Sequence, residues 1–181
     1  MDQDLSAQLS PTIAKYTALF TRQVYNEEPF QSDILLEAFH LSPVVIRQHK
    51  QYWHRHLGAC WERLVKSVFS SHVSYQGTIR LKNKSPCDFT FDKIAVDTKY
   101  RLGSGDSGTM GKLSRNAQWL KSMGFEPMML ILREDNLPQA IARMQGAGWA
   151  VLCADASFKF IARHGDFDLK AYLDSLKTRI A

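Results

Sequence analysis

The segment PCDFTFDKIAVDTKY, residues 86–100, constrains the fold more than any other part of the chain. Apolar and polar side chains alternate on both sides of Asp92-Lys93, which is typical of two antiparallel strands joined by a tight turn. A two-residue loop and a four-residue loop at this point give the same pairing register. That register places the carboxylates of Asp88 and Asp97 directly opposite one another on neighbouring strands.

The two faces of the predicted hairpin differ in chemical character. One face holds apolar side chains and a threonine, and we expect it to pack in the core: Phe89, Phe91, Ile94, Val96 and Thr98. The other face is polar, and its members are Asp88, Thr90, Ala95, Asp97 and Lys99. Side chains directly opposed on paired strands have Cβ atoms about 5 Å apart, so the two carboxylates would lie close together, with the lysine one step along.

A pair of opposed carboxylates suggests a metal site. Two like charges at this spacing repel, and a fold keeps such a pair most easily when a cation sits between them. Oxygen ligands in this geometry favour Mg²⁺, which can activate water and stabilise the transition state of phosphodiester hydrolysis. Lys99 would orient or deprotonate the attacking water, or neutralise developing charge. The plain alternative is an exposed hairpin with scattered charges, because the pattern D…DxK is short.

The rest of the chain surrounds the hairpin with helical and strand patterns. Apolar residues recur at helical spacing up to about residue 70, with a break expected near Gly58. The later predicted elements are strands over residues 73–81, 88–91 and 94–100, a helix over 109–123, a strand over 128–132, a helix over 137–145, a strand over 149–153 and one or two final helices. This order predicts an α/β protein, with a mixed sheet between two layers of helices and a C-terminal helix–strand–helix extension.

The N-terminal part of the chain is predicted to be helical. Two Ser-Pro pairs, at residues 10–11 and 42–43, place a capping serine before a proline at the first helical position. We therefore divide the chain into two parts. Residues 1–57 form a helical segment that would bind DNA or form a dimer interface, and residues 58–181 form a core with its C-terminal extension.

The charge distribution favours an anionic partner. The chain contains 23 basic and 18 acidic residues, a formal balance of +5. Residues 47–84 alone carry eight basic residues against the single acid Glu62, a balance of +7. The segment RQHKQYWHRH, residues 47–56, interleaves basic and aromatic side chains, as nucleic-acid-binding surfaces do. For any one of these residues, a solvated helix face is the alternative.

The motif and its setting resemble the PD-(D/E)xK nuclease superfamily, and within it the type II restriction endonucleases. Asp88 matches the acidic half-motif and DTK at residues 97–99 matches the (D/E)xK half-motif, although the proline stands one position early, at Pro86. The continuation DTKYRLGSGDSGT is similar to the ApaLI-type restriction enzymes. The resemblance covers residues 58–132, and it implies the αβββαβ core of that superfamily.

The resemblance implies a sequence-specific endonuclease that hydrolyses double-stranded DNA. Asp88 and Asp97 would bind Mg²⁺, for which we expect Mn²⁺ to substitute, and Lys99 would assist the water. A glutamate on a helix often supports the metal in this superfamily, and Glu62 is the matching residue. The alternative for Glu62 is an ion pair with Lys66, four residues along a solvated helix face.

The resemblance also implies partners. Cutting both strands of a palindrome requires two sites related by a twofold axis, so we expect a homodimer. We expect contacts with double-stranded DNA from seven side chains: Arg47, Lys50, His54, Arg55, Arg101, Ser104 and Lys112.

Three other functions stay open on the sequence. A repair or recombination nuclease of the same superfamily would share this site, and a DNA-binding module would keep the fold without activity. The loop at residues 103–108 has the spacing GxGxxG between a predicted strand and a predicted helix, which is the setting of a dinucleotide-binding loop. We expect no nucleotide cofactor, because the preceding strand carries Asp97 and Lys99 where a dinucleotide-binding sheet has an apolar strand.

The sequence also indicates a cellular compartment. The N-terminus, MDQDLSAQLS, lacks the basic and apolar regions of a signal peptide, and the apolar run at residues 128–132 is too short to span a bilayer. The three cysteines are widely spaced and match no zinc-binding pattern. We therefore expect a cytoplasmic protein with reduced thiols and no membrane partner.

Overall fold

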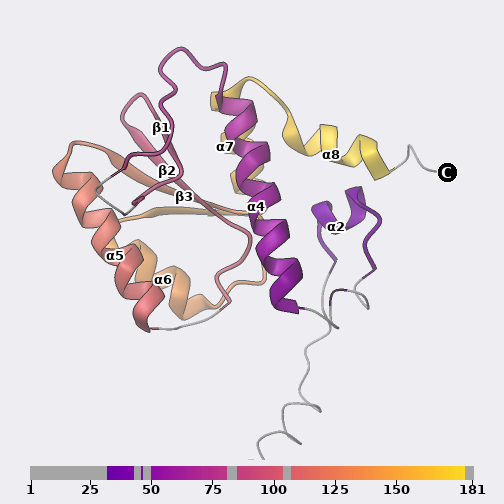
Figure 1. Cartoon of the computed structure of the whole chain (residues 1–181), viewed down its shortest axis with the longest axis horizontal. Coiled ribbons are helices and arrows are strands. Elements are labelled where there is room, and N and C mark those ends of the chain that lie inside the picture. Colours follow the sequence, from indigo (N-terminus) through magenta and orange to yellow (C-terminus); the bar gives the residue numbers. More distant parts are fainter. Residues whose placement is uncertain (1–31, 43–45, 47–49, 81–84, 104–106, 178–181) are drawn as a thin grey trace, which may run out of the picture. The chain divides into compact units, whose positions relative to one another are not determined.

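The computed structural model describes residues 32–42, 46, 50–80, 85–103 and 107–177. From β2 to α7 its strands and helices alternate along the chain (Figure 1). In chain order they are α2 (Ile34–Ala38), α4 (Lys50–Phe69), β1 (Phe89–Phe91), β2 (Ile94–Lys99), α5 (Ser107–Ser122), β3 (Glu126–Ile131), α6 (Pro138–Ala147), β4 (Ala150–Cys153), α7 (Asp155–Gly165) and α8 (Leu169–Lys177).

The four strands form one sheet in the order β1-β2-β3-β4. β1 runs antiparallel to β2, whereas β3 runs parallel to both β2 and β4. This mixed sheet, with helices joining its parallel strands, confirms the predicted α/β class. The hairpin register is also the predicted one, because Phe91 pairs with Ile94 and Phe89 pairs with Val96.

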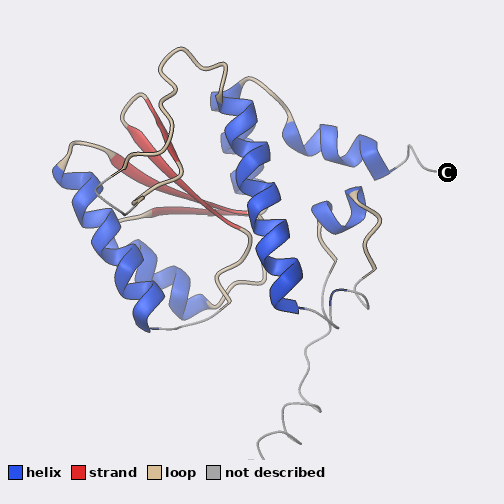
Figure 2. Ribbon diagram, in the orientation of Figure 1, coloured by secondary structure: helices blue, strands red, loops and turns tan. Residues whose placement is uncertain are grey.

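Helices cover both faces of the sheet (Figure 2). α4 packs on β2 and on α7, and α7 also packs on β4. On the other face α5 packs on β3 and α6, and an apolar cluster there includes Ala95, Met129 and Ile131 of the sheet. Met129, Leu130 and Ile131 are fully buried, as expected of a short apolar strand covered on both faces.

Helix α4 is attached to the sheet by buried residues at helical spacing. Trp61, Val65 and Phe69 lie four residues apart and are fully buried. The indole Nε1 of Trp61 donates a hydrogen bond of 3.1 Å to the carbonyl oxygen of Leu130 in β3. The centroid of the Phe69 ring lies 4.7 Å from that of Phe91 in β1. These contacts fix the position of α4 relative to β1, β2 and β3.

The polar face of the hairpin is buried as well, so the alternative of an exposed hairpin does not hold for Thr90, Ala95 and Asp97. Thr90 and Ala95 of that face are 1% and 0% exposed, and Ala95 lies in the apolar cluster with α5. Both faces of the hairpin therefore pack against helices, and the charged groups lie toward its open end. Alternation does not reveal this arrangement, because an alanine and a hydrogen-bonded threonine tolerate burial as well as exposure.

The strand predicted over residues 73–81 is wrong for the described part of that segment, which contains one isolated β-bridge between Gln76 and Thr90. The backbone N–H of Gln76 donates to the carbonyl oxygen of Thr90 at 2.7 Å, and the reciprocal bond measures 2.8 Å. Two residues on, the hydroxyl of Thr78 donates to the carbonyl oxygen of Asp88 at 2.7 Å. The hydroxyl of Thr78 therefore satisfies the carbonyl oxygen of Asp88, which would accept a backbone hydrogen bond if the strand were longer.

The break predicted near Gly58 is also wrong, because α4 runs without interruption from Lys50 to Phe69. A glycine inside a helix costs about 1 kcal/mol, and the buried stripe on either side of it outweighs that cost. The compact unit that contains the sheet extends from Asp33 to Ala181, so it begins before the expected division at residue 58. The helix expected after residue 10 lies outside the described residues.

Backbone strain is present where β4 passes into α7. Ala154 has φ 45° and ψ −121°, a conformation that costs a non-glycine residue about 1–3 kcal/mol. Replacing Ala154 with glycine is expected to raise the free energy of unfolding by about 1 kcal/mol, because the relieved strain exceeds the entropy that glycine adds to the unfolded chain. Urea unfolding measures the change. Ala156→Gly, in the first turn of α7, is the matched control and should lower stability; a similar loss in both variants would argue against strain at Ala154.

Candidate active site

Four of the predicted site residues come together at the open end of the hairpin. Asp97 and Lys99 lie in the second half of β2. Asp88 precedes β1, where the paired register has ended, and its charge acts on Asp97. Glu62 comes from α4, the helix that packs on β2. The charge of Glu62 acts on both Asp97 and Lys99, so its carboxylate lies near the hairpin.

Asp88 is held by the backbone and side chain of β2. Its N–H donates to the carbonyl oxygen of Val96 at 2.8 Å. Its Oδ2 accepts two hydrogen bonds of 2.7 Å from Thr98, one from the backbone N–H and one from the hydroxyl. Within the described part of the chain its Oδ1 accepts no hydrogen bond, so this is the oxygen that a ligand would use.

Asp97 is a buried acid with a perturbed pKa. The residue is 6% exposed, and burial raises the pKa of its carboxyl from 3.8 to about 6. The ammonium of Lys99, which donates to Oδ1 of Asp97, lowers that pKa, while the charges of Asp88 and Glu62 raise it. One lysine therefore does not offset the burial and the two neighbouring carboxylates, and the site favours additional positive charge.

The perturbed carboxyl of Asp97 makes stability depend on pH. Between pH 3.8, where the unfolded carboxyl titrates, and about pH 6, the folded chain holds a proton that the unfolded chain has lost. This contribution to stability is present at the lower pH and is lost as the pH rises through 6. In metal-free buffer, Asp97→Asn is expected to be more stable than the wild type above pH 6 and equally stable below pH 4.

Urea unfolding as a function of pH measures this difference. Asp166→Asn, which changes an exposed carboxyl, is the matched control and should show no such crossover. A stability difference between Asp97→Asn and the wild type that is the same at every pH would contradict the assigned titration.

Lys99 carries positive charge into the cluster. Its Nζ donates to Oδ1 of Asp97 and, at 3.1 Å, to the carbonyl oxygen of Thr98. Burial lowers the pKa of Lys99, but the charges of Asp97, Asp88 and Glu62 outweigh burial, so the pKa is raised above 10.5. Lys99 is therefore protonated at neutral pH, and of its predicted roles, hydrogen-bond donation fits this environment better than deprotonation of water.

The structure combines both interpretations of Glu62. Its Oε1 accepts a hydrogen bond of 2.5 Å from Nζ of Lys66, which is the ion pair expected at this helical spacing. The Glu62 side chain is 38% exposed, yet its charge still reaches Asp97 and Lys99. Glu62 therefore lies at the rim of the cluster, with Lys66 holding its carboxylate.

Cys87 lies beside the cluster as a protonated thiol. It is 1% exposed, and burial raises the pKa of its thiol to about 11. A hydrogen bond with the backbone of Ile79 lowers that pKa, and the charges of Asp88 and Asp97 raise it. Because metal ligation and nucleophilic attack require a thiolate, Cys87 fits a packing role. All three cysteines of the chain are free.

The carboxylate oxygens at this end of the hairpin suit Mg²⁺. Asp88 and Asp97 each use one oxygen within the protein, and the other oxygen accepts no hydrogen bond in the described part of the chain. Mg²⁺ is commonly bound by one or two carboxylates, with water and substrate phosphate completing its shell. Among the described residues, no three or more His, Cys, Asp or Glu side chains form a ready metal cage.

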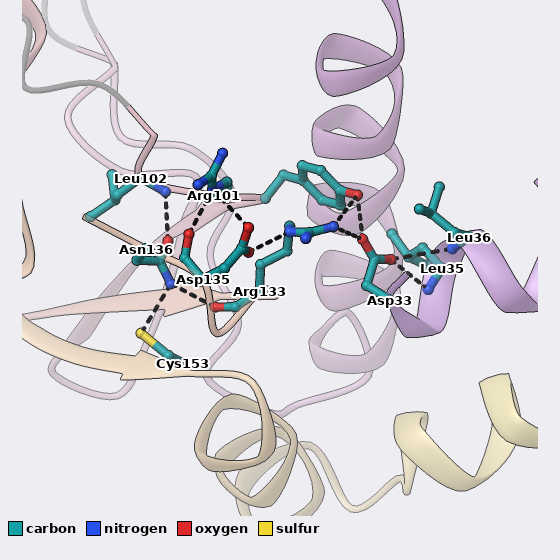
Figure 3. A network of polar contacts seen from close by, with 10 residues as sticks. Asp33, Leu35, Leu36, Arg101, Leu102, Arg133, Asp135, Asn136 and Cys153 are labelled. Carbon is teal, nitrogen blue, oxygen red and sulfur yellow. Dashed lines mark hydrogen bonds and ion pairs between the residues drawn. The ribbon is translucent and has the colours of Figure 1, made fainter. Parts of the chain in front are cut away.

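A polar network that the sequence analysis missed borders the cluster (Figure 3). The guanidinium of Arg133 donates from Nη1 to Oδ2 of Asp33 at 2.7 Å and from Nε to Oδ1 of Asp135 at 2.6 Å. Tyr100, the residue after Lys99, donates its hydroxyl to Asp33 and accepts from Arg133 at 3.4 Å. The network thus ties the segments that follow β2 and β3 to the residue that caps α2.

The predicted DNA contacts lie on several elements. Arg55 on α4 and Lys112 on α5 are exposed, as a phosphate contact requires. Ser104 and Arg47 lie outside the described residues, as does the side chain of Lys50.

Two of the predicted contacts are already engaged within the protein. The half-buried ring of His54 lies 5.6 Å, between centroids, from the ring of Tyr100, so it packs toward the end of β2. Arg101 donates its Nε to the carbonyl oxygen of Asp135 at 2.7 Å, and the same nitrogen lies 3.2 Å from Oδ2 of Asp135 (Figure 3). The Nε of Arg101 is therefore engaged by Asp135, and the ring of His54 packs beside Tyr100.

No described helix, including the 20-residue α4, combines the length and the apolarity that a membrane span requires. Comparisons with protein-family models, with curated proteins and with solved structures find no match for this chain.

Proposed function

We propose that this chain is an endonuclease that hydrolyses the phosphodiester bonds of double-stranded DNA in a Mg²⁺-dependent reaction. The observation that carries the proposal is the cluster at the end of the hairpin. There the charges of Asp88 and Glu62 act on the buried Asp97, which is paired with Lys99. Two opposed acids and a lysine two residues after the second acid match the PD-(D/E)xK pattern.

The free oxygens of Asp88 and Asp97 would hold Mg²⁺. When bound, the ion supplies positive charge that stabilises the transition state of hydrolysis and lowers the pKa of the attacking water. The charge balance supports this assignment, because the pKa of Asp97 stays raised even with Lys99 beside it. Glu62 adds a negative charge at the rim, and Lys66 orients its carboxylate.

Lys99 would act as a fixed hydrogen-bond donor. Its backbone belongs to β2, and its Nζ is held by Asp97 and by the carbonyl oxygen of Thr98. A protonated amine in this position can orient the attacking water, or it can stabilise the phosphate oxygen that gains negative charge. Both roles place the contribution of Lys99 in the transition state.

The order of elements supports a restriction-endonuclease-like core. α4, β1, β2, α5 and β3 follow one another as in the αβββαβ arrangement, with the bridge between Gln76 and Thr90 in place of the first strand. We assign the activity to a type II restriction enzyme, which cuts both strands at a defined sequence and therefore works as a homodimer. The exposed Arg55 and Lys112 would contact the DNA backbone.

Digestion of DNA tests this function directly. The full chain is incubated with a mixture of plasmid and phage DNA in the presence of Mg²⁺, and the ends of the products are sequenced. Discrete fragments that share one end sequence are expected, and EDTA is expected to abolish them. Mn²⁺ should replace Mg²⁺, because both ions accept carboxylate oxygen ligands.

Other outcomes would favour the functions that share these residues. Cleavage at branches, flaps or nicks without a shared end sequence would indicate a repair or recombination nuclease. Salt-sensitive DNA binding without cleavage would indicate a non-catalytic DNA-binding module. If the folded protein, supplied with Mg²⁺, neither binds nor cleaves DNA, the proposal is contradicted.

A dinucleotide-binding enzyme is the second candidate, and the parallel unit formed by β2, α5 and β3 favours it. The GxGxxG loop joins β2 to α5, although residues 104–106 lie outside the described part of the chain. However, β2 carries Asp97 and Lys99 in a charged cluster, whereas the strand that precedes a dinucleotide-binding loop is apolar. If NAD or NADP raises the melting temperature of the protein, and Mg²⁺ with DNA does not raise it, the dinucleotide-binding enzyme is favoured over the nuclease.

A further inference from the structure

A cavity of about 410 Å³ opens between the C-terminal half of α4 and the segment that joins α7 to α8. Apolar walls come from Leu64 and Val68 of α4 and from Leu169 of α8. The end of α7 approaches α4 closely at this point, because a Cβ on Gly165 would lie only 2.4 Å from Cγ1 of Val68. The residues that line this cavity are distinct from those of the candidate active site.

Two aromatic rings and a carboxylate line the same cavity. Phe167 and Tyr172 are each 45% exposed, and their ring centroids lie 5.8 Å apart with the planes inclined at 56°. Asp166 precedes Phe167 and also lines the cavity. Within the described part of the chain its carboxylate makes no hydrogen bond or ion pair, and no described lysine, arginine or histidine lines the cavity.

We propose that this cavity binds a small organic cation with an apolar body. The faces of aromatic rings carry partial negative charge and attract ammonium and guanidinium groups. Asp166 adds a full negative charge at the same place, so the two effects act in the same direction. The aliphatic walls from Leu64 and Val68 would take up the apolar part of the ligand. This proposal does not depend on the nuclease function.

The size and the charge of the cavity select the class of ligand. Ligand pockets in proteins commonly measure about 300–1,000 Å³, and the volume of this open cavity lies within that range. A neutral apolar compound would gain from the walls and nothing from Asp166, whereas an anion would be repelled by it. An arylalkylammonium compound combines the positive charge, the apolar body and the size that these residues favour.

Binding of benzyltrimethylammonium to the full chain tests the proposal. Amide chemical shifts are followed by two-dimensional NMR during titration with this cation, with neutral benzyl alcohol and with anionic phenylacetate. Saturable shifts confined to residues near Phe167 and Tyr172 are expected for the cation, with weaker binding of the alcohol and none of phenylacetate. Equal binding of the cation and the alcohol, or no saturable binding of the cation, would overturn the proposal.

Two variants and a matched control sharpen the test. Asp166→Asn and Tyr172→Ala are each expected to weaken binding of the cation about fivefold. Asp166 occupies the left-handed region with φ 51°, which asparagine also tolerates, so this variant should fold normally. Glu134→Gln removes an exposed carboxylate outside the cavity and should leave the affinity unchanged. If a folded Asp166→Asn variant binds the cation with unchanged affinity, the proposed preference of this cavity for cations is wrong.

Discussion

Replacing Lys99 with methionine is expected to lower the rate of DNA cleavage by about two to four orders of magnitude. Methionine fills much of the space of lysine but removes the ammonium that donates to Asp97. The loss should fall on the rate of the chemical step, because an interaction made in the transition state affects the rate more than the binding of DNA. Single-turnover cleavage in Mg²⁺ and DNA binding in EDTA measure the two quantities separately.

Lys93→Met is the matched control for this experiment. Lys93 is exposed at the turn of the same hairpin, so its loss removes the same charge without changing the cluster. Its cleavage rate should stay close to that of the wild type, provided that melting curves show both variants to be folded. A folded Lys99→Met variant that cleaves at the wild-type rate would exclude Lys99 from the site and contradict the role assigned to its ammonium.

Replacing Arg133 with methionine is expected to lower the free energy of unfolding by about 3–5 kcal/mol. Arg133 is 4% exposed, and its guanidinium forms ion pairs with Asp33 and Asp135. The Asp33 side chain is itself only 11% exposed, so the variant would leave a buried carboxylate without a cationic partner, held by the hydroxyl of Tyr100 and by the N–H groups of Leu35 and Leu36. Urea unfolding of the two proteins measures the difference.

Two further variants show whether the loss comes from the ion pair. Arg143→Met, on the exposed face of α6, should change stability by less than about 0.5 kcal/mol. Adding Asp33→Asn to Arg133→Met should recover part of the loss, because asparagine keeps the oxygen that caps Leu35 and Leu36 and removes the unpaired charge. Losses that simply add in the double variant would show that the two residues are not coupled.

The hairpin could be predicted from the sequence for a physical reason. Alternation determines which side chains share a face, and a tight turn at Asp92-Lys93 determines which residues of β1 and β2 oppose one another, which brings Asp88 and Asp97 to the same end of the hairpin. The next strand toward the N-terminus was mispredicted, because the hydroxyl of Thr78 takes the place of a ladder bond. The spacing of apolar residues predicts which side chains are buried. It does not predict where a side chain, in place of a backbone group, forms the hydrogen bond to a neighbouring strand.

Helix α4, which carries Glu62, shows the same limit. Its buried stripe was visible at helical spacing, and the ion pair between Glu62 and Lys66 follows from their separation along the helix. Which side of α4 faces the hairpin depends instead on packing, because Trp61 is bonded to Leu130 of β3 across the layer. The approach of Glu62 to Asp97 is therefore a consequence of the tertiary structure.

The sequence by itself determined the α/β class, the register of the hairpin and the proximity of Asp88, Asp97 and Lys99, because these depend on residues close together along the chain. Only the tertiary structure decided that Asp97 is buried deeply enough for its pKa to reach about 6. It also decided that Arg133 pairs with Asp33, which lies 100 residues away. Burial and pairing over such distances depend on how helices and strands pack together, and no local pattern of residues encodes that packing.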